Sequence, residues 1–195
     1  EKYLGIEKYN YTKNEDTQIG VVNGMAYTSY GGDILPIEVT MYKGKGNLIL
    51  TGSLGEVMKE SCKIAISYVK TILKEIGVEE NQLEENDIHI HAPEGAVPKD
   101  GPSAGIALTS AIISMLKKQA VSNTISMTGE ITLTGRVLPI GGLKEKSIGA
   151  HRAGIKKVFI PKENEKDLTE VPEEIKNNLE YILVENYKEV YEKLF

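Results

Sequence analysis

The stretch that decides the fold reads PEGAVPKDGPSAGIALTSAIISML and spans residues 93–116. Prolines, glycines and charges precede Ser103, and an almost unbroken run of apolar and small residues follows it. This change predicts a loop that leads into a buried helix running from Ser103 to about Lys118. Pro102 suits the first turn of a helix, and Gly101 lets the backbone pass close to a ligand. Ser103 is therefore either the start of the helix or a reactive group.

The position of Ser103 suits a nucleophile as well as a helix cap. The first N–H groups of a helix have no internal partner and carry the positive end of its dipole. Those of Ser103 and Ala104 would therefore stabilise a developing oxyanion. Serine is also among the residues most often found at helix N-caps. The sequence GPSAG matches the G-x-S-x-G elbow of α/β-hydrolases, but no apolar strand precedes it and no Asp lies between Ser103 and His151.

A serine hydroxyl needs a base, and Lys146 is the candidate. It lies in LKEKSIGAHRAG, residues 143–154, which predicts a helix closed by Gly154. On a helical wheel Lys146 is the one charged side chain on a face of apolar or small residues. Desolvation lowers the pKa of such an amine, and a neutral amine is a competent general base. The alternative is that Lys146 snorkels to water. Together, Ser103 and Lys146 predict a Ser–Lys dyad.

Strands and helices alternate along the rest of the chain without strict βαβ regularity. A strand, a turn and a second strand are predicted over 19–41, with the reversal at Gly31, Gly32 and Asp33. A long amphipathic helix is predicted over 55–76 and ends at Gly77. The predicted fold class is α/β (mixed α+β), a domain with several short sheets flanked by helices.

Composition restricts the function classes. The chain has 195 residues, of which 41% are hydrophobic and 26% charged, which fits one domain with a sizeable core. The net charge of −5 argues against a general nucleic-acid or membrane-surface binder. The single cysteine, Cys62, excludes an internal disulfide framework, suits a reducing compartment and is expected to pack as a small apolar group. Residues 1–18 are polar and lack an initiator Met, and we interpret them as a linker or arm. Residues 19–195 are interpreted as the folded domain that contains Ser103 and Lys146.

Two further patterns were weighed as binding sites. His89 and His91 lie two residues apart on a predicted strand and therefore face the same way. No third ligand is near them in sequence and zinc sites need three or four, so no metal site is predicted. The sequence YKGKGN, residues 42–47, lacks the spacing of a P-loop, so the chain cannot hydrolyse ATP by that route.

Three long motifs carry a family resemblance. The stretches PKDGPSAG, TGEITLTGRVLPIGGLKEKSIGAHRAG and IPKENEKDL closely resemble the proteolytic domain of the Lon family of ATP-dependent serine proteases, in its bacterial A-type branch. The likeness extends over nearly the whole chain from Ile19 onward. It implies that Ser103 is the nucleophile and Lys146 its base. Thr128, in MTGE, falls where the family has a threonine that helps hold the lysine amine. Asp100, in PKDG, matches an acidic residue whose conformation is linked to whether the site is open.

The resemblance also implies a cellular role. It implies a serine endopeptidase that degrades unfolded, misfolded and regulatory proteins in protein quality control and the stress response. An upstream AAA+ ATPase module of the same full-length chain would use ATP and Mg²⁺, whereas this domain needs no cofactor. The family forms hexameric rings in the cytoplasm, with no membrane or nucleic-acid partner expected for this domain. Two alternatives stay open: an α/β-hydrolase-type esterase using Ser103 and His151, and a non-catalytic assembly or gating module.

Overall fold

The structure is a computed structural model that describes residues 17–94 and 99–195. The predicted arm, residues 1–18, therefore lies almost entirely outside the described residues. The strands are β1 (Val21–Thr28), β2 (Gly31–Lys43), β3 (Leu48–Thr51), β4 (Asn86–His91), β5 (Ile125–Met127), β6 (Glu130–Ile131), β7 (Val137–Leu138), β8 (Lys157–Pro161) and β9 (Glu180–Val184). The α-helices are α1 (Glu56–Ile72), α2 (Gly105–Lys117), α3 (Leu143–Arg152), α4 (Glu173–Asn178) and α5 (Tyr187–Leu194). Two 3₁₀ segments cover Glu80–Gln82 and Lys162–Glu170.

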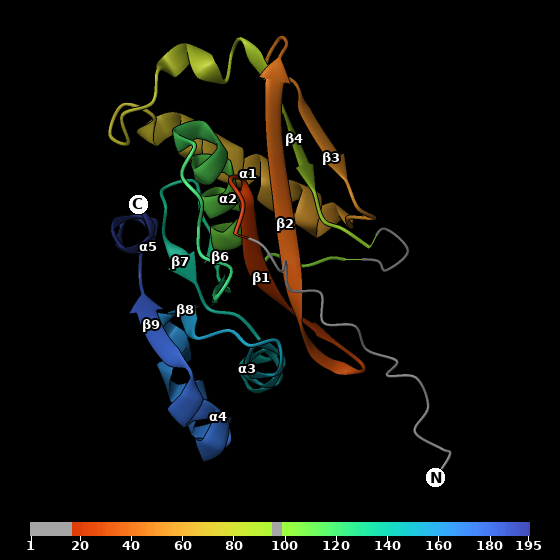
Figure 1. Cartoon of the computed structure of the whole chain (residues 1–195), viewed down its shortest axis with the longest axis vertical. Helices are drawn as coiled ribbons and strands as arrows, with labels where there is room; N and C mark the ends of the chain where they lie inside the picture. Colours follow the sequence, from red (N-terminus) through yellow and green to blue (C-terminus); the bar gives the residue numbers. More distant parts are fainter. Residues whose placement is uncertain (1–16, 95–98) are drawn as a thin grey trace.

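One mixed sheet organises the molecule. Its strand order is β3-β4-β2-β1-β5-β8-β9, and β6 and β7 form a separate two-stranded pair. The long β1–β2 hairpin lies at its centre (Figure 1) and is antiparallel, whereas β1 pairs with β5, and β5 with β8, in parallel. The predicted α/β (mixed α+β) class is confirmed. Most of the expected short sheets join into this single sheet.

Helices cover both faces of the sheet. Because side chains alternate along a strand, Leu35 and Ile37 of β2 join the core beneath α1 and α2, whereas Ile34 faces Leu143 and Ala150 of α3. Figure 1 shows α3 near the turn end of the β1–β2 hairpin, and the two core clusters place α2 on the other face of the sheet. The segments that carry Ser103 and Lys146 thus approach the hairpin from opposite faces. Among the described residues, no helix is long and apolar enough to cross a membrane.

Two sequence-based boundaries were wrong. The α2 helix begins at Gly105 with Ala104 as its N-cap, two residues after the predicted start at Ser103. The hairpin reverses at residues 29–30, so Gly31 and Gly32 belong to β2 and pair across it. Gly31 has a positive φ of 111°, as the prediction required of a reversal. Gly32 has a different use, because a side chain there would run into the backbone carbonyl of Glu145 on α3.

Candidate active site

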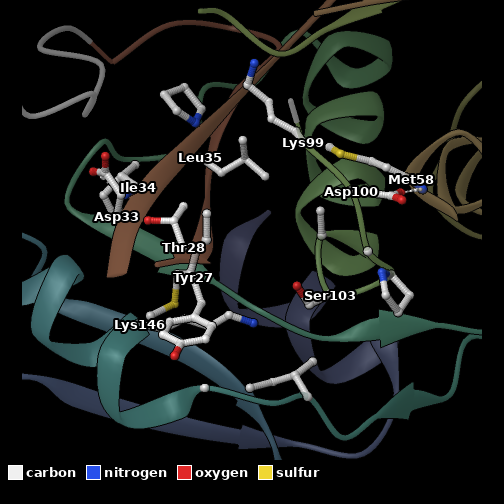
Figure 2. A pocket seen from close by; sticks show the side chains of 18 of the residues that line it. Tyr27, Thr28, Asp33, Ile34, Leu35, Met58, Lys99, Asp100, Ser103 and Lys146 are labelled. Atoms are coloured by element: carbon white, nitrogen blue, oxygen red, sulfur yellow. Dashed lines mark hydrogen bonds between the residues drawn. The ribbon is translucent and has the colours of Figure 1, made fainter. Parts of the chain in front are cut away.

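A cavity of about 940 Å³ lies beside the β1–β2 hairpin. Its walls are the hairpin, the segment 99–104 that leads into α2, the segment 139–142 that leads into α3, and Lys146 itself. Figure 2 shows the Ser103 hydroxyl and the Lys146 amine extending into this cavity from different elements and pointing toward one another. The fold therefore brings together, in one cavity, two residues that are 43 positions apart in the chain.

Ser103 lies just before α2 and does not cap it. The N-cap is Ala104, and no side chain makes a capping hydrogen bond there. The hypothesis that Ser103 is a helix cap is therefore wrong, and its partly exposed side chain faces the cavity instead. Its carbonyl is fixed by the N–H of Gly129, at 2.8 Å. Within residues 17–94 and 99–195, the backbone N–H groups of Ser103 and Ala104 donate no hydrogen bond.

The close fit between α2 and the end of β5 explains why Ser103 sits where it does. The N–H of Ile106, in the first turn of α2, donates to the carbonyl of Gly129 at 3.1 Å. A Cβ on Gly105 would lie 2.6 Å from the N of Ile131, which is closer than side chains pack. Glycine at 105 thus allows the start of the helix to lie against the β5–β6 connection. Because of that contact, Ser103 lies next to the end of β5.

Lys146 is buried on α3, with only 4% of its surface exposed. The buried face of α3 is the one predicted from the helical wheel, and it includes Leu143, Ser147, Gly149 and Ala150. Desolvation by burial lowers the pKa of the Lys146 amine to about 8. The expected desolvation is thus present, and the snorkelling alternative is wrong. At mildly alkaline pH much of this amine is neutral and able to accept a proton.

Thr128 links the lysine to the serine backbone. The Lys146 amine donates a hydrogen bond of 3.2 Å to Thr128 Oγ1. The hydroxyl of Thr128, itself fully buried, lies 3.5 Å from the carbonyl oxygen of Ser103, to which it donates. Among the described residues no hydrogen bond joins Ser103 Oγ directly to Lys146 Nζ. The free ends of the two side chains therefore share the cavity, with Thr128 as their common neighbour.

Asp100 lies on the wall of the cavity but bonds away from it. Its carboxylate accepts the N–H of Met58 in the first turn of α1, at 3.0 Å. Backbone N–H bonds from Gly101, Met58 and Val57 lower the pKa of this carboxyl below its usual range, so it is ionised at neutral pH. Nothing in the sequence predicted the contact, because Asp100 and Met58 are 42 residues apart.

The other sequence candidates lie outside this arrangement. His89 and His91 both contact Thr51 Oγ1, at 2.8 and 2.7 Å, on the neighbouring strand. Within the described ranges no group of three or more His, Cys, Asp or Glu could hold a metal ion. His151 is partly exposed on α3 and does not line the cavity, so the esterase alternative lacks its base there. Residues 100–102 form no strand before Ser103, as that alternative requires.

Cys62 behaves as predicted. It is fully buried in the core of α1 and packs as a small apolar group. Burial raises the pKa of its thiol to about 12. Because the thiolate is the reactive form, Cys62 is chemically inert in the folded protein.

Some of the cavity lining could not be read from the sequence. Tyr27 and Thr28 at the end of β1, and Asp33 on β2, line the cavity, and Figure 2 shows Tyr27 beside Lys146. Tyr27 has 58% of its surface exposed, and its ring packs over Gly142 at the start of α3. The only sequence signal is that aromatic Tyr27 stands close to a hairpin turn. That signal does not indicate which distant element the ring will meet.

Comparison with known proteins identifies the class. The chain is 58% identical over 195 residues to the Lon protease of Mycoplasma mycoides, covering 100% of this chain and 24% of that protein. It is 55% identical over 190 residues to the Lon protease of Dictyoglomus thermophilum, covering 97% and 24%. It is 56% identical over 187 residues to Lon protease 1 of Bacillus subtilis, covering 96% and 24%. The chain therefore corresponds to one part of these Lon proteases.

The family follows from a match over the full chain. The family model of the Lon protease (S16) C-terminal proteolytic domain matches residues 1–195. The chain belongs to this family, and the resemblance noted from its motifs is confirmed. It spans about a quarter of the length of the curated relatives that it matches.

Proposed function

We propose that this chain is a serine endopeptidase domain in which Ser103 is the nucleophile and Lys146 the general base. The observation that carries the proposal is the Lys146 amine, which is buried, has its pKa lowered to about 8 and points toward the Ser103 hydroxyl in a large cavity. A neutral amine is the form that can take a proton from a hydroxyl. Ser–Lys pairs are a known variant of the nucleophile–base arrangement.

The reaction would proceed in two halves. As Ser103 Oγ attacks the carbonyl carbon of the scissile peptide bond, the neutral amine of Lys146 takes the hydroxyl proton. The N–H groups of Ser103 and Ala104 would donate to the oxyanion. Lys146 then gives its proton to the leaving nitrogen as the C–N bond breaks, which leaves an ester on Ser103. Water, deprotonated by Lys146, attacks that ester, and Lys146 returns this proton to Ser103 Oγ as the ester C–O bond breaks and the acid is released.

Thr128 and Asp100 would support this chemistry without reacting. The hydroxyl of Thr128 accepts from the Lys146 amine and donates to the Ser103 carbonyl. It would therefore hold the Lys146 amine at a fixed distance from the backbone of Ser103. Asp100 would act on the segment that precedes Ser103, because its carboxylate fixes that segment to α1.

The substrate would bind as an added strand along the free edge of β1. That strand pairs with β5 only at Asn23 and Gly24. The next four residues, Met25–Thr28, pair with β2 on one side, and among the described residues no strand pairs with their other side. They also line the cavity. An extended peptide paired with this edge would place its scissile bond at the end of β5, next to Ser103.

The wider role rests on the family. We propose that the domain works with an AAA+ ATPase module of a longer chain in a cytoplasmic hexameric ring, degrading unfolded, misfolded and regulatory proteins in the stress response. The support is that the relatives are about four times longer than this chain. Measuring the mass of the full-length protein in solution, and its degradation of an unfolded protein with and without ATP and Mg²⁺, tests this part.

The test of the dyad combines a reagent with two variants. A fluorophosphonate probe, which phosphonylates activated serines with loss of fluoride, should label the purified protein at Ser103, as located by peptide mass spectrometry. Lys146→Ala should abolish labelling and peptide cleavage, and His151→Ala should leave both unchanged. Near-normal cleavage by Lys146→Ala would refute the dyad. Loss of labelling in His151→Ala alone would favour the esterase alternative, and no labelling of the unmodified protein would favour a non-catalytic module.

A further inference from the structure

The N-terminus of α1 is capped by a residue from a distant part of the chain. Its own N-cap, Gly55, has no side chain to offer, and no local side chain caps the helix. Asp100 fills this role by accepting the N–H of Met58 at 3.0 Å, the contact drawn as a dashed line in Figure 2. A carboxylate is favoured at this end of a helix by the free N–H groups and the helix dipole. The cap thus comes from the segment that leads directly into Ser103.

The space where a side chain of residue 55 would lie is occupied by the Asp100 carboxylate. Gly55 has φ −73° and ψ 170°, an extended conformation that any residue can adopt. A Cβ at this position, however, would lie 2.5 and 2.6 Å from the two carboxylate oxygens of Asp100. Serine, threonine and aspartate are preferred over glycine at N-caps in general. The absence of a side chain here therefore keeps space for the carboxylate.

The same connection also holds Lys99. The N–H of Gly55 donates to the carbonyl of Lys99 at 2.7 Å, and the N–H of Lys99 donates to the carbonyl of Ser53 at 3.0 Å. The Lys99 amine adds a bond of 2.9 Å to the carbonyl of Gly52. Of two successive residues, Lys99 is thus fixed to the β3–α1 connection and Asp100 to the first turn of α1. Ser103 lies three residues further on, and the Gly129 N–H fixes its carbonyl from the other side.

We propose that the first turn of α1 positions Ser103 by binding the Asp100 carboxylate. Gly55 is then a positioning residue for the reaction, because it leaves room for that carboxylate. The inference rests on the proposed function of Ser103. If the Asp100 carboxylate leaves the first turn of α1, the segment 100–102 is held only at its two ends, by the bonds of Lys99 and of the Ser103 carbonyl, and Ser103 shifts relative to Lys146. A displacement of about 1 Å at a reacting atom lowers a rate by roughly 100-fold.

The experiment introduces a side chain at Gly55 and measures the fluorophosphonate labelling rate of Ser103. Gly55→Ser supplies a good local cap, so the unfolding midpoint should remain within a few degrees of the unmodified protein, whereas the labelling rate should fall by roughly 10- to 100-fold. Asp100→Ala should lower the rate similarly. The double variant Gly55→Ala/Asp100→Ala should be no slower than Asp100→Ala alone, because without the carboxylate the new Cβ has room. Val57→Ala, at an exposed position of the same turn, is the matched control.

The outcomes separate this inference from the proposed function. An unchanged labelling rate in Gly55→Ser and Gly55→Ala, with the unmodified protein labelled at Ser103, would overturn the inference and leave the dyad standing. Additive losses in the double variant would also overturn it, because Gly55 would then act independently of Asp100. If the Gly55 variants do not fold, Asp100→Ala decides the question. It leaves Gly55 in place and removes the acceptor, so a labelling rate equal to that of the unmodified protein would count against the inference.

Discussion

The amine of Lys146 donates a hydrogen bond of 3.2 Å to the hydroxyl of Thr128, which closely follows strand β5. Both side chains are buried, and the Thr128 hydroxyl is oriented in turn toward the carbonyl of Ser103. A buried amine needs an acceptor, because an unpaired polar group in the interior costs free energy. This contact therefore both satisfies the lysine and fixes its distance from the serine.

Removing the Thr128 hydroxyl should affect stability and activity together. In Thr128→Val the Lys146 amine loses its acceptor, which should cost about 1–3 kcal/mol in the free energy of unfolding. Peptide cleavage should fall roughly tenfold or more, since a general base must be held in place to work. Thr128→Ser keeps the hydroxyl and should restore most of the cleavage rate. Equal rates in the Val and Ser variants would show that the hydroxyl of Thr128 does not set the cleavage rate.

Ser103→Ala should remove activity without weakening the fold. Because Ser103 does not cap α2, its hydroxyl supplies no capping bond, and the change in the free energy of unfolding should stay within about 0.5 kcal/mol. A lost N-cap would instead cost about 1 kcal/mol. The cleavage rate should fall by roughly 10⁴-fold or more, as expected for loss of a nucleophile. Urea unfolding and a fluorogenic peptide assay measure the two effects.

How far the sequence predicts the site depends on how local each signal is. The buried face of α3 follows from the spacing of small residues around Lys146, which is a property of one helix. The loop-to-helix change at Ser103 is equally local, although Gly101 and Pro102 placed the helix start two residues too early. These signals identified the two residues that share the cavity. The pairing of the two residues was predicted because a serine nucleophile needs a base, and the family resemblance implies the same pair.

The relationships that sequence reasoning missed all join distant segments. Asp100 caps a helix that begins 44 residues before it, and no periodicity links the two. Gly32 was interpreted as a turn residue because paired glycines are frequent in reversals. Its actual neighbour is the backbone of α3, more than a hundred residues later. The sequence alone does not distinguish a glycine that allows a close backbone contact from a glycine that allows a turn.

Gly32→Ala should therefore disturb the placement of Lys146. A Cβ at Gly32 would meet the backbone of Glu145 and lie 2.9 Å from the N of Lys146, so α3 must move away from β2. Overpacking of this kind costs roughly 1–3 kcal/mol. The cleavage rate should fall as well, because the helix that moves carries the base. Gly141→Ala, where a Cβ meets nothing within 4 Å, should leave the free energy of unfolding nearly unchanged and serves as the control.

The pKa of Lys146 should appear in the pH dependence of stability. Burial lowers this pKa from 10.5 to about 8 in the folded protein. Between about pH 8 and 10.5 the unfolded chain therefore binds more protons than the folded one, so the contribution of Lys146 to the free energy of unfolding rises with pH in that window. A difference of about 2.5 pKa units corresponds to roughly 3 kcal/mol. Below about pH 8 the buried amine carries this full cost.

Lys146→Met isolates the effect, because Met fills a similar volume without a charge. The variant should be more stable than the unmodified protein near pH 7, and the difference between them should shrink by roughly 3 kcal/mol as the pH rises from 8 to 10.5. Groups such as Cys62, whose raised pKa opposes this trend at high pH, are present in both proteins and cancel in the difference. Urea unfolding of both proteins at half-unit pH steps measures it. A difference that does not change with pH would mean that the Lys146 amine keeps its ordinary pKa in the folded protein, and the proposed general base would then stay charged even at mildly alkaline pH.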